Sequence, residues 1–215
     1  MYLVMFDIDG TLVDSDAFEE ELFLTAINDA LNVTVSCDWH KYDHVTDSGI
    51  LHQIIDTHSS KADREQLHFE VKTRFVQLTH EHIQKNPGSI REIQGAREFM
   101  LELLKSSNTC VAIATGGWEE TAKLKLDAIG IDPDGLPFAS GSDAISRANI
   151  MKLAEARTTS SAPFTKKTYL GDRSWDKKAS AELGYNFIAV GDKVDHYAQI
   201  PDYSSKTKVL ELIGL

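Results

Sequence analysis

The sequence has few features of a secreted, membrane-bound or nucleic-acid-binding protein. Its 215 residues include only two cysteines, Cys37 and Cys110, which lie far apart, so we expect no disulfide framework. No apolar run approaches the length of a membrane span, and no basic segment precedes the first expected strand. Lys and Arg number 22 against 33 Asp and Glu, a net charge of -11 that argues against nucleic acid or an anionic membrane as a partner. We therefore expect a soluble cytoplasmic protein.

The first part of the chain is expected to be helical. Apolar residues recur at helical spacing over about residues 18–31, 47–58 and 62–84, and no strand pattern lies between Asp14 and Asn86. The stretch ends at Asn86-Pro87-Gly88, a strong breaker of regular structure. We predict an all-helical domain over residues 15–87.

The rest of the chain alternates apolar runs with helical patterns. Strands are expected at 2–6, 109–114, 138–140, 168–170 and 187–190, and helices near 96–104, 118–128, 146–156, 175–183 and 206–213. This alternation predicts an α/β fold with a doubly wound parallel sheet and helices on both faces. Residues 1–14 and 88–215 would form this core, with the helical domain inserted after the first strand.

The most informative motif is Asp7-Ile8-Asp9-Gly10-Thr11-Leu12, directly after the apolar run 2–6. Two carboxylates at the end of a buried strand cost several kcal/mol each unless a cation or hydrogen bonds compensate. A surface turn would also explain Asp-x-Asp. The whole hexapeptide, however, is expected by chance with a probability on the order of 10⁻⁴ in a chain of this size. A functional site is the better interpretation.

Other polar groups follow the other expected strands, where an open parallel sheet binds its ligands. Thr115 and Gly116 open a helix after the second strand and are suited to an oxyanion, although an ordinary strand–helix turn looks the same. Asp172 and Asp176 follow the fourth strand; with Asp7 they would surround a hard divalent cation, unless they only cap the helix. Arg147 begins the helix after the third strand and would face a phosphate, although such an arginine is often solvated.

These motifs, in this order, resemble the haloacid dehalogenase superfamily, in its phosphoglycolate phosphatase and β-phosphoglucomutase-like branch. The resemblance spans the chain: Asp7 to Leu12, then Thr115-Gly116, Arg147, and Gly171-Asp172 with Asp176. It implies a Rossmann-like core, and it implies that residues 15–87 are the small helical cap domain of that family.

The resemblance also implies roles. Asp7 would be the nucleophile and Asp9 the general acid and base. Asp7, the backbone carbonyl of Asp9, and Asp172 would hold Mg²⁺, with Asp176 acting directly or through water. Three groups would hold the transferring phosphoryl oxygens, namely Thr115, Gly116 and Arg147.

The chain departs from the family pattern at the third motif, and two further positions separate related chemistries. The family often has lysine in a Gly-Lys-Pro setting at its third motif, where this chain has Ser146-Arg147-Ala148; Lys152 is the alternative cation. Asp9 favours phosphoryl transfer over dehalogenation, because a departing halide needs no proton. A phosphonate-cleaving relative would need a cap lysine for a Schiff base. Lys41 is the nearest candidate, but a solvated lysine is the simpler interpretation.

The sequence thus predicts a magnesium-dependent phosphatase acting on a small phosphorylated metabolite, as a monomer or homodimer. A sugar-phosphate mutase and a non-catalytic binding protein of the same fold are the alternatives. We expect the loop 44–49 to lie over the substrate and the cap to move about hinges near Asp14-Ser15 and Pro87-Gly88. Trp118 either lines the pocket or is packed, and the seven histidines of the cap show no spacing typical of a metal motif.

Overall fold

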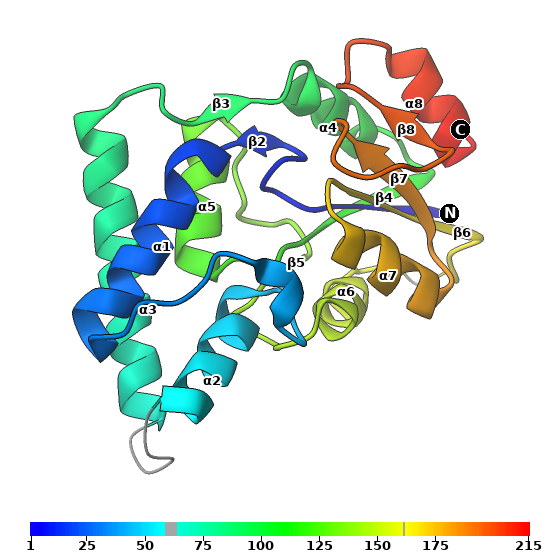
Figure 1. Cartoon of the computed structure of the whole chain (residues 1–215). Coiled ribbons are helices and arrows are strands. Elements are labelled where there is room, and N and C mark those ends of the chain that lie inside the picture. The colour runs from blue at the N-terminus through cyan, green and yellow to red at the C-terminus, as the bar shows by residue number, and fades with distance from the viewer. Residues whose placement is uncertain (59–63, 161) are drawn as a thin grey trace.

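A six-stranded parallel sheet is the centre of the computed structural model, which describes residues 1–58, 64–160 and 162–215 (Figure 1). The strand order is β5 (Phe138–Ala139), β4 (Thr109–Ala114), β1 (Tyr2–Phe6), β6 (Lys166–Gly171), β7 (Asn186–Val190) and β8 (Gln199–Ile200). Each neighbouring pair runs parallel. Because β1 lies between β4 and β6, the residues that follow these three strands meet at one edge of the sheet.

Helices cover both faces of the sheet, as the alternating pattern predicted. Val4 and Phe6 of β1 face a core shared with α4 (Ala96–Leu104), α5 (Glu119–Ala128) and α8 (Lys206–Ile213). Leu3 and Met5 face the opposite core, shared with α6 (Arg147–Ala156) and α7 (Ser174–Leu183). All four β1 side chains are fully buried, and each contributes about 1.5–3 kcal/mol by leaving water. The α/β fold class is confirmed.

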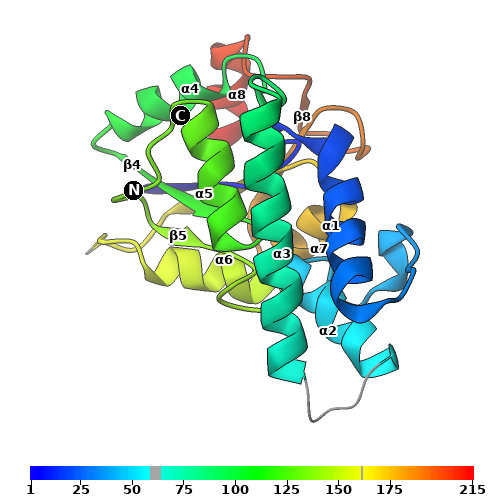
Figure 2. The same cartoon turned by 90° about the vertical axis from the view of Figure 1, so that its left-hand side faces the viewer.

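The inserted segment forms its own helical layer. It contains α1 (Asp16–Leu31), a 3₁₀ turn at Trp39–Lys41, α2 (Asp47–His58) and α3 (Arg64–Lys85). Within its described residues, 15–58 and 64–86, it has no strand. The predicted start of the third helix near residue 62 lies outside the described residues. In Figure 2, α1, α3 and α5 stand side by side, with α5 joining this layer to the core. The division into a core and a cap at residues 15 and 87 stays a prediction.

A short pair of strands closes the base of the helical segment. β2 (Val13–Asp14) and β3 (Arg91–Glu92) pair antiparallel where the chain leaves and re-enters the core, and Arg91 contacts Asp14 at 2.8 Å. The sequence analysis predicted neither strand, nor β8, because two residues are too few to show an alternating pattern. Among the described helices, none has the length and apolarity needed to cross a membrane.

Candidate active site

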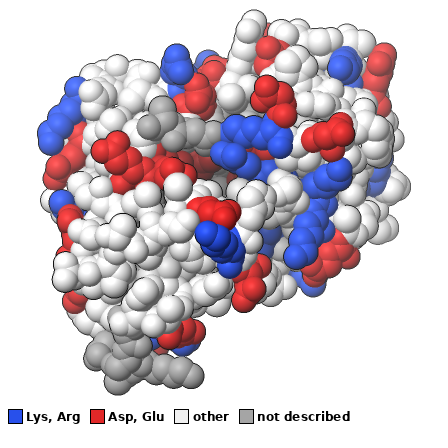
Figure 3. Space-filling view, viewed as in Figure 1, with Lys and Arg blue, Asp and Glu red and all other residues white. Residues whose placement is uncertain are grey.

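The residues predicted from the strand ends meet around one cavity of about 250 Å³. Asp7, Thr115 and Asp172 follow β1, β4 and β6, and Arg147 is the first residue of α6. The helical segment supplies the facing wall, so the cavity lies between the two layers. In Figure 3, acidic and basic side chains face one another across the middle of the molecule, between these layers.

Asp7 is a buried carboxylate that is held by a hydrogen bond and an ion pair. Its side chain accepts a hydrogen bond from the backbone N–H of Ile8 at 2.8 Å, and only 4% of the residue is exposed. Nη1 of Arg147 lies 3.2 Å from its Oδ1. Burial raises the pKa of Asp7, while the Arg147 guanidinium opposes that shift. Ionisation of Asp7 is therefore favoured by the positive charge beside it and opposed by its burial.

Arg147 connects two of the acids and lies against Gly116. Its Nε is 3.3 Å from Oδ1 of Asp176, so the guanidinium bridges Asp7 and Asp176. A Cβ on Gly116 would stand 2.6 Å from Nη2 of Arg147, closer than real contacts allow. Glycine is therefore required at this position for the arginine to reach the site. The alternative cation, Lys152, is exposed and does not line the cavity.

We expect Gly116→Ala to weaken phosphoryl binding by displacing Arg147. About a tenfold drop in kcat/KM is the expected result, because charge-assisted contacts to the substrate would lengthen. Gly117→Ala is the comparison: its Cβ would meet no atom closer than 3.8 Å, so it adds a methyl group to the same cavity without displacing Arg147, and we expect a smaller loss. Steady-state kinetics on both variants checks this, and equal losses would contradict the steric argument.

Asp7, Asp172 and Asp176 form a buried carboxylate cluster that fits a hard divalent cation. One oxygen from each lies within 4.8 Å of the others. Oδ1 of Asp172 and Oδ1 of Asp176 have no hydrogen-bond partner among the described residues, although Arg147 lies beside the latter. Carboxylate oxygens are the ligands that magnesium and calcium prefer. The donor set therefore suits such an ion.

Positive side chains offset part of the negative charge of this carboxylate cluster. Nζ of Lys193 and Nε of Arg173 lie 3.0 and 3.1 Å from Oδ2 of Asp172. Burial raises the pKa of Asp172 to about 6, and these two cations limit the rise. Gly10, at φ +69°, allows the close approach, since a Cβ there would stand 2.0 Å from the same Oδ2. The glycine of the first motif is thus needed to admit Asp172.

Asp9 belongs to a buried network that the sequence analysis missed. Its Oδ1 accepts hydrogen bonds from Lys125 Nζ at 2.6 Å and from Ser15 Oγ at 2.5 Å. Lys125, from α5, also pairs with Glu19 of α1, and its side chain is 0% exposed. A helical lysine among polar residues looks solvated in the sequence, so only its contacts with Asp9 and with Glu19 of α1 reveal its place.

One buried cation serves two acids in this network. Burial favours a higher pKa for Asp9, but Lys125 and the hydrogen bonds outweigh it, so the pKa of Asp9 is lowered. Burial and the charge of Asp9 raise the pKa of Glu19 to about 8. Asp9 is therefore the anion of the pair, and Lys125 holds it by Oδ1.

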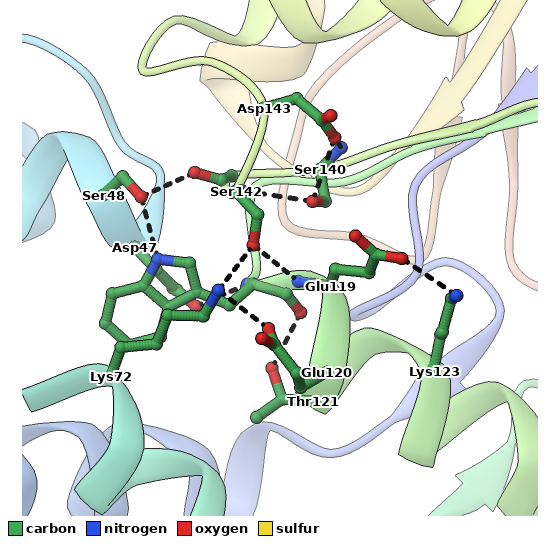
Figure 4. Close-up of polar contacts among 12 residues, drawn as sticks. Asp47, Ser48, Lys72, Glu119, Glu120, Thr121, Lys123, Ser140, Ser142 and Asp143 are labelled. Carbon is green, nitrogen blue, oxygen red and sulfur yellow. Dashed lines mark hydrogen bonds and ion pairs between the residues drawn. The ribbon is translucent and has the colours of Figure 1, made fainter. Parts of the chain in front are cut away.

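Polar bonds fasten the helical segment to the core beside the site (Figure 4). Asp47 Oδ2 accepts from the backbone N–H of Trp118 at 2.9 Å, and Ser48 Oγ donates to the carbonyl of Gly141 at 2.5 Å. Lys72 pairs with Glu120 at 2.9 Å. Thr46 and Asp47 of the segment 44–49 line the cavity, but only residues 44–46 are a loop, because α2 begins at Asp47. The role of this segment over the substrate stays a prediction.

Trp118 is packed rather than lining the cavity. It follows β4 of the core, yet it is fully buried in the apolar cluster of the helical segment, against Phe23, Phe75 and His68. Its indole N–H donates to Ser48 Oγ at 2.8 Å. Any rotation of residues 15–87 away from the sheet would have to withdraw this side chain, which opposes movement about the predicted hinges.

Lys41 lies outside the site. It is exposed, contacts Asp38 at 3.3 Å and does not line the cavity. The structure therefore offers no support for a Schiff-base role at this position, and the solvated interpretation is the better one.

Comparisons with known proteins agree with this geometry. A search of the curated proteins gave no match. Among solved structures, a hydrolase from Pseudomonas syringae is 22% identical, with TM-score 0.67 over 92% of this chain and 88% of that chain. CbbY from Rhodobacter sphaeroides in complex with phosphate is 17% identical, with TM-score 0.70 over 94% and 95%. Beta-phosphoglucomutase from Clostridium difficile is 13% identical, with TM-score 0.72 over 98% and 96%.

These likenesses show a shared fold. The family assignment comes from a family model, described as haloacid dehalogenase-like hydrolase, which matches residues 4–190 and so covers the first motif, the helical segment and the Asp172 loop. The resemblance read from the four motifs is confirmed: the chain belongs to the haloacid dehalogenase-like hydrolase family.

Proposed function

We propose that the protein is a magnesium-dependent phosphatase that hydrolyses a small phosphomonoester through an aspartyl-phosphate. The observation that carries this proposal is the pair of acids after β1. Asp7 lies beside Arg147 and the carboxylate cluster, while Asp9 lies in a separate network with Lys125. This separation supports assigning one acid to attack and the other to proton transfer.

The first step forms a covalent bond to Asp7. A carboxylate oxygen of Asp7 attacks phosphorus, the ester P–O bond breaks, and Asp9 donates a proton to the leaving alcohol. Thr115, the Gly116 amide and Arg147 hold the phosphoryl oxygens. In the second step Asp9 takes a proton from water, which attacks phosphorus, releases inorganic phosphate and restores Asp7.

Asp9 is oriented for both steps. Lys125 and Ser15 hold its Oδ1, and a Cβ on Gly117, beside the cavity, would stand 3.8 Å from its Oδ2. The lowered pKa of Asp9 keeps the carboxylate deprotonated, which is the form that the base step needs. For the acid step, Asp9 must first take up a proton, which a phosphomonoester can bring because its second pKa is about 6.

The residues that would hold Mg²⁺ are Asp7, the backbone carbonyl of Asp9, Asp172 and Asp176. Bound there, the ion would offset the negative charge of the nucleophile and the phosphate. Without the ion, the carboxylates and the phosphate would repel one another. We therefore expect activity to depend strictly on a divalent cation. The net charge of the chain and the reduced cysteines also support a cytoplasmic location.

A screen of phosphorylated metabolites tests the proposal. We expect release of inorganic phosphate with Mg²⁺ and loss of at least about 100-fold after chelation, restored when Mg²⁺ is added back. Oxygen-labelled water separates the predicted phosphatase from the sugar-phosphate mutase, because only hydrolysis places the label in released phosphate. Turnover unaffected by chelation would contradict the metal-dependent mechanism, and isomerisation without phosphate release would favour the mutase.

A further inference from the structure

The wall that the helical segment contributes to the cavity is aromatic and acidic. Phe23, Trp39 and Phe75 supply rings, and Glu20 and Asp47 supply carboxylates. Glu20 accepts a hydrogen bond from the Trp39 indole N–H at 3.0 Å, so ring and acid are held together. This composition constrains the part of the substrate that lies on the cap side.

No described lysine or arginine of the helical segment lines the cavity. Each of the five in residues 15–58 and 64–87 forms an ion pair elsewhere: Lys41 with Asp38, Arg64 with Asp56, Lys72 with Glu120, Arg74 with Asp29, and Lys85 with Glu81. The described part of this wall therefore offers an anion no counter-charge.

The basic side chains that reach the site come from the core. Arg147 pairs with Asp7 and Asp176, whereas Arg173 and Lys193 lie against Asp172. These contacts place positive charge beside the nucleophile and the carboxylate cluster, where the phosphoryl group would bind. Lys125 is fully buried between Asp9 and Glu19.

Asp47 lies on the side where the leaving alcohol would depart. A Cβ on Gly117 would be 3.8 Å from Oδ2 of Asp47 and 3.8 Å from Oδ2 of Asp9, so the two carboxylates flank the same point. The alcohol that takes its proton from Asp9 would therefore pass beside Asp47.

We propose that the leaving alcohol carries no anionic group, and is a small neutral or cationic alcohol with some apolar surface. The proposal rests on the phosphatase function proposed above. A carboxylate or second phosphate would lie beside the partly buried Asp47 and the exposed Glu20, with no cation from the described cap to offset the repulsion between like charges. A hydroxyl or ammonium instead donates to these acids, and an ammonium is also attracted to aromatic faces.

Matched pairs of esters test the charge preference. The purified full chain with Mg²⁺ is assayed on glycerol phosphate against phosphoglycerate, and on ethanolamine phosphate against phosphoglycolate. The first pair exchanges a hydroxymethyl group for a carboxylate, and the second exchanges an aminomethyl group, charged as ammonium, for a carboxylate. We expect kcat/KM to be about tenfold or more higher for the ester without the carboxylate in both pairs.

Asp47→Asn tests the residue that carries the preference. The amide keeps the shape of the side chain and an oxygen for the Trp118 N–H, while the charge is removed. We expect the ratio of kcat/KM within each pair to shrink about threefold or more. Asp43→Asn is the control, because Asp43 is exposed and does not line the cavity. A ratio is insensitive to how much of a variant folds.

The outcomes separate this inference from the proposed function. Hydrolysis of the carboxylated esters at equal or higher efficiency would overturn the inference and leave the phosphatase function standing. An unchanged ratio in Asp47→Asn would overturn the role of Asp47. Failure to hydrolyse any ester, in these pairs and in the wider metabolite screen, would overturn the phosphatase function and the inference together.

Discussion

Asp7→Asn is expected to abolish turnover while the protein stays folded. Losses of roughly 10⁴-fold or more follow removal of a covalent nucleophile. Asp176 also pairs with Arg147 and belongs to the cluster, but of these two acids only Asp7 lines the cavity. The amide is isosteric and can still accept the hydrogen bond from Ile8. Because burial penalises the charge of Asp7, its removal should not lower the free energy of unfolding appreciably.

Two measurements check this result. Phosphate release gives the loss of activity, and mass spectrometry of acid-quenched enzyme looks for a phosphoryl adduct on Asp7 in the unaltered protein. Asp134→Asn is the control, since the Asp134 side chain is 86% exposed. Turnover by Asp7→Asn above a hundredth of the original rate, or an adduct that maps to another residue, would rule out the nucleophile assigned here.

Much of the candidate site followed from the sequence because its members occupy strand ends. The carboxyl ends of parallel strands lie at one edge of the sheet. The alternation of strands and helices therefore predicts that Asp7, Thr115 and Asp172 lie at that edge. The position of Arg147 could be predicted because its helix follows a strand of the same sheet. Asp176 lies one turn beyond Asp172. The strand order, with β1 between β4 and β6, brings these residues next to one another, and the sequence pattern does not show that order.

The missed residues depend on contacts between layers. Lys125 reaches Asp9 from 116 positions away, and it also pairs with Glu19 of the helical segment. Trp118 follows a core strand in the sequence but packs in the apolar cluster of the helical segment. Its hydrophobicity does not indicate which of the two layers buries it. Lys193 is different: it follows β7 closely, so the strand-end argument would have found it had it been applied to that strand.

Lys125→Met is expected to destabilise the folded protein strongly and also to lower its kcat. The substitution leaves Asp9 and Glu19 buried beside each other with no cation between them, and breaking a buried ion pair in this way costs about 3–5 kcal/mol. For a chain of this length, that corresponds to a fall in Tm of roughly 10 °C. Thermal unfolding followed by circular dichroism measures it.

Lys123→Met is a matched control two residues earlier on the same helix. Lys123 pairs with Glu119 at 2.9 Å at the surface, and its side chain is 38% exposed. Exposed ion pairs contribute about 0–1 kcal/mol, so this variant should unfold within a few degrees of the unaltered protein. Equal effects of the two substitutions would mean that α5 simply tolerates methionine poorly.

The double variant Lys125→Met, Glu19→Gln distinguishes charge from packing. Measured above pH 8, where Glu19 of the unaltered protein is ionised, Glu19→Gln removes one of the two negative charges that Lys125 offsets, so the cost of losing Lys125 should be about 1 kcal/mol or more smaller in this background. Stability would then recover in part, but Asp9 would still lack the ammonium that holds its Oδ1. We therefore expect kcat to stay at least about 100-fold low in both Lys125 variants, because proton transfer depends on a positioned acid. Recovery of kcat along with stability would show that Lys125 serves the fold alone; recovery of stability without kcat would identify it as the residue that positions Asp9.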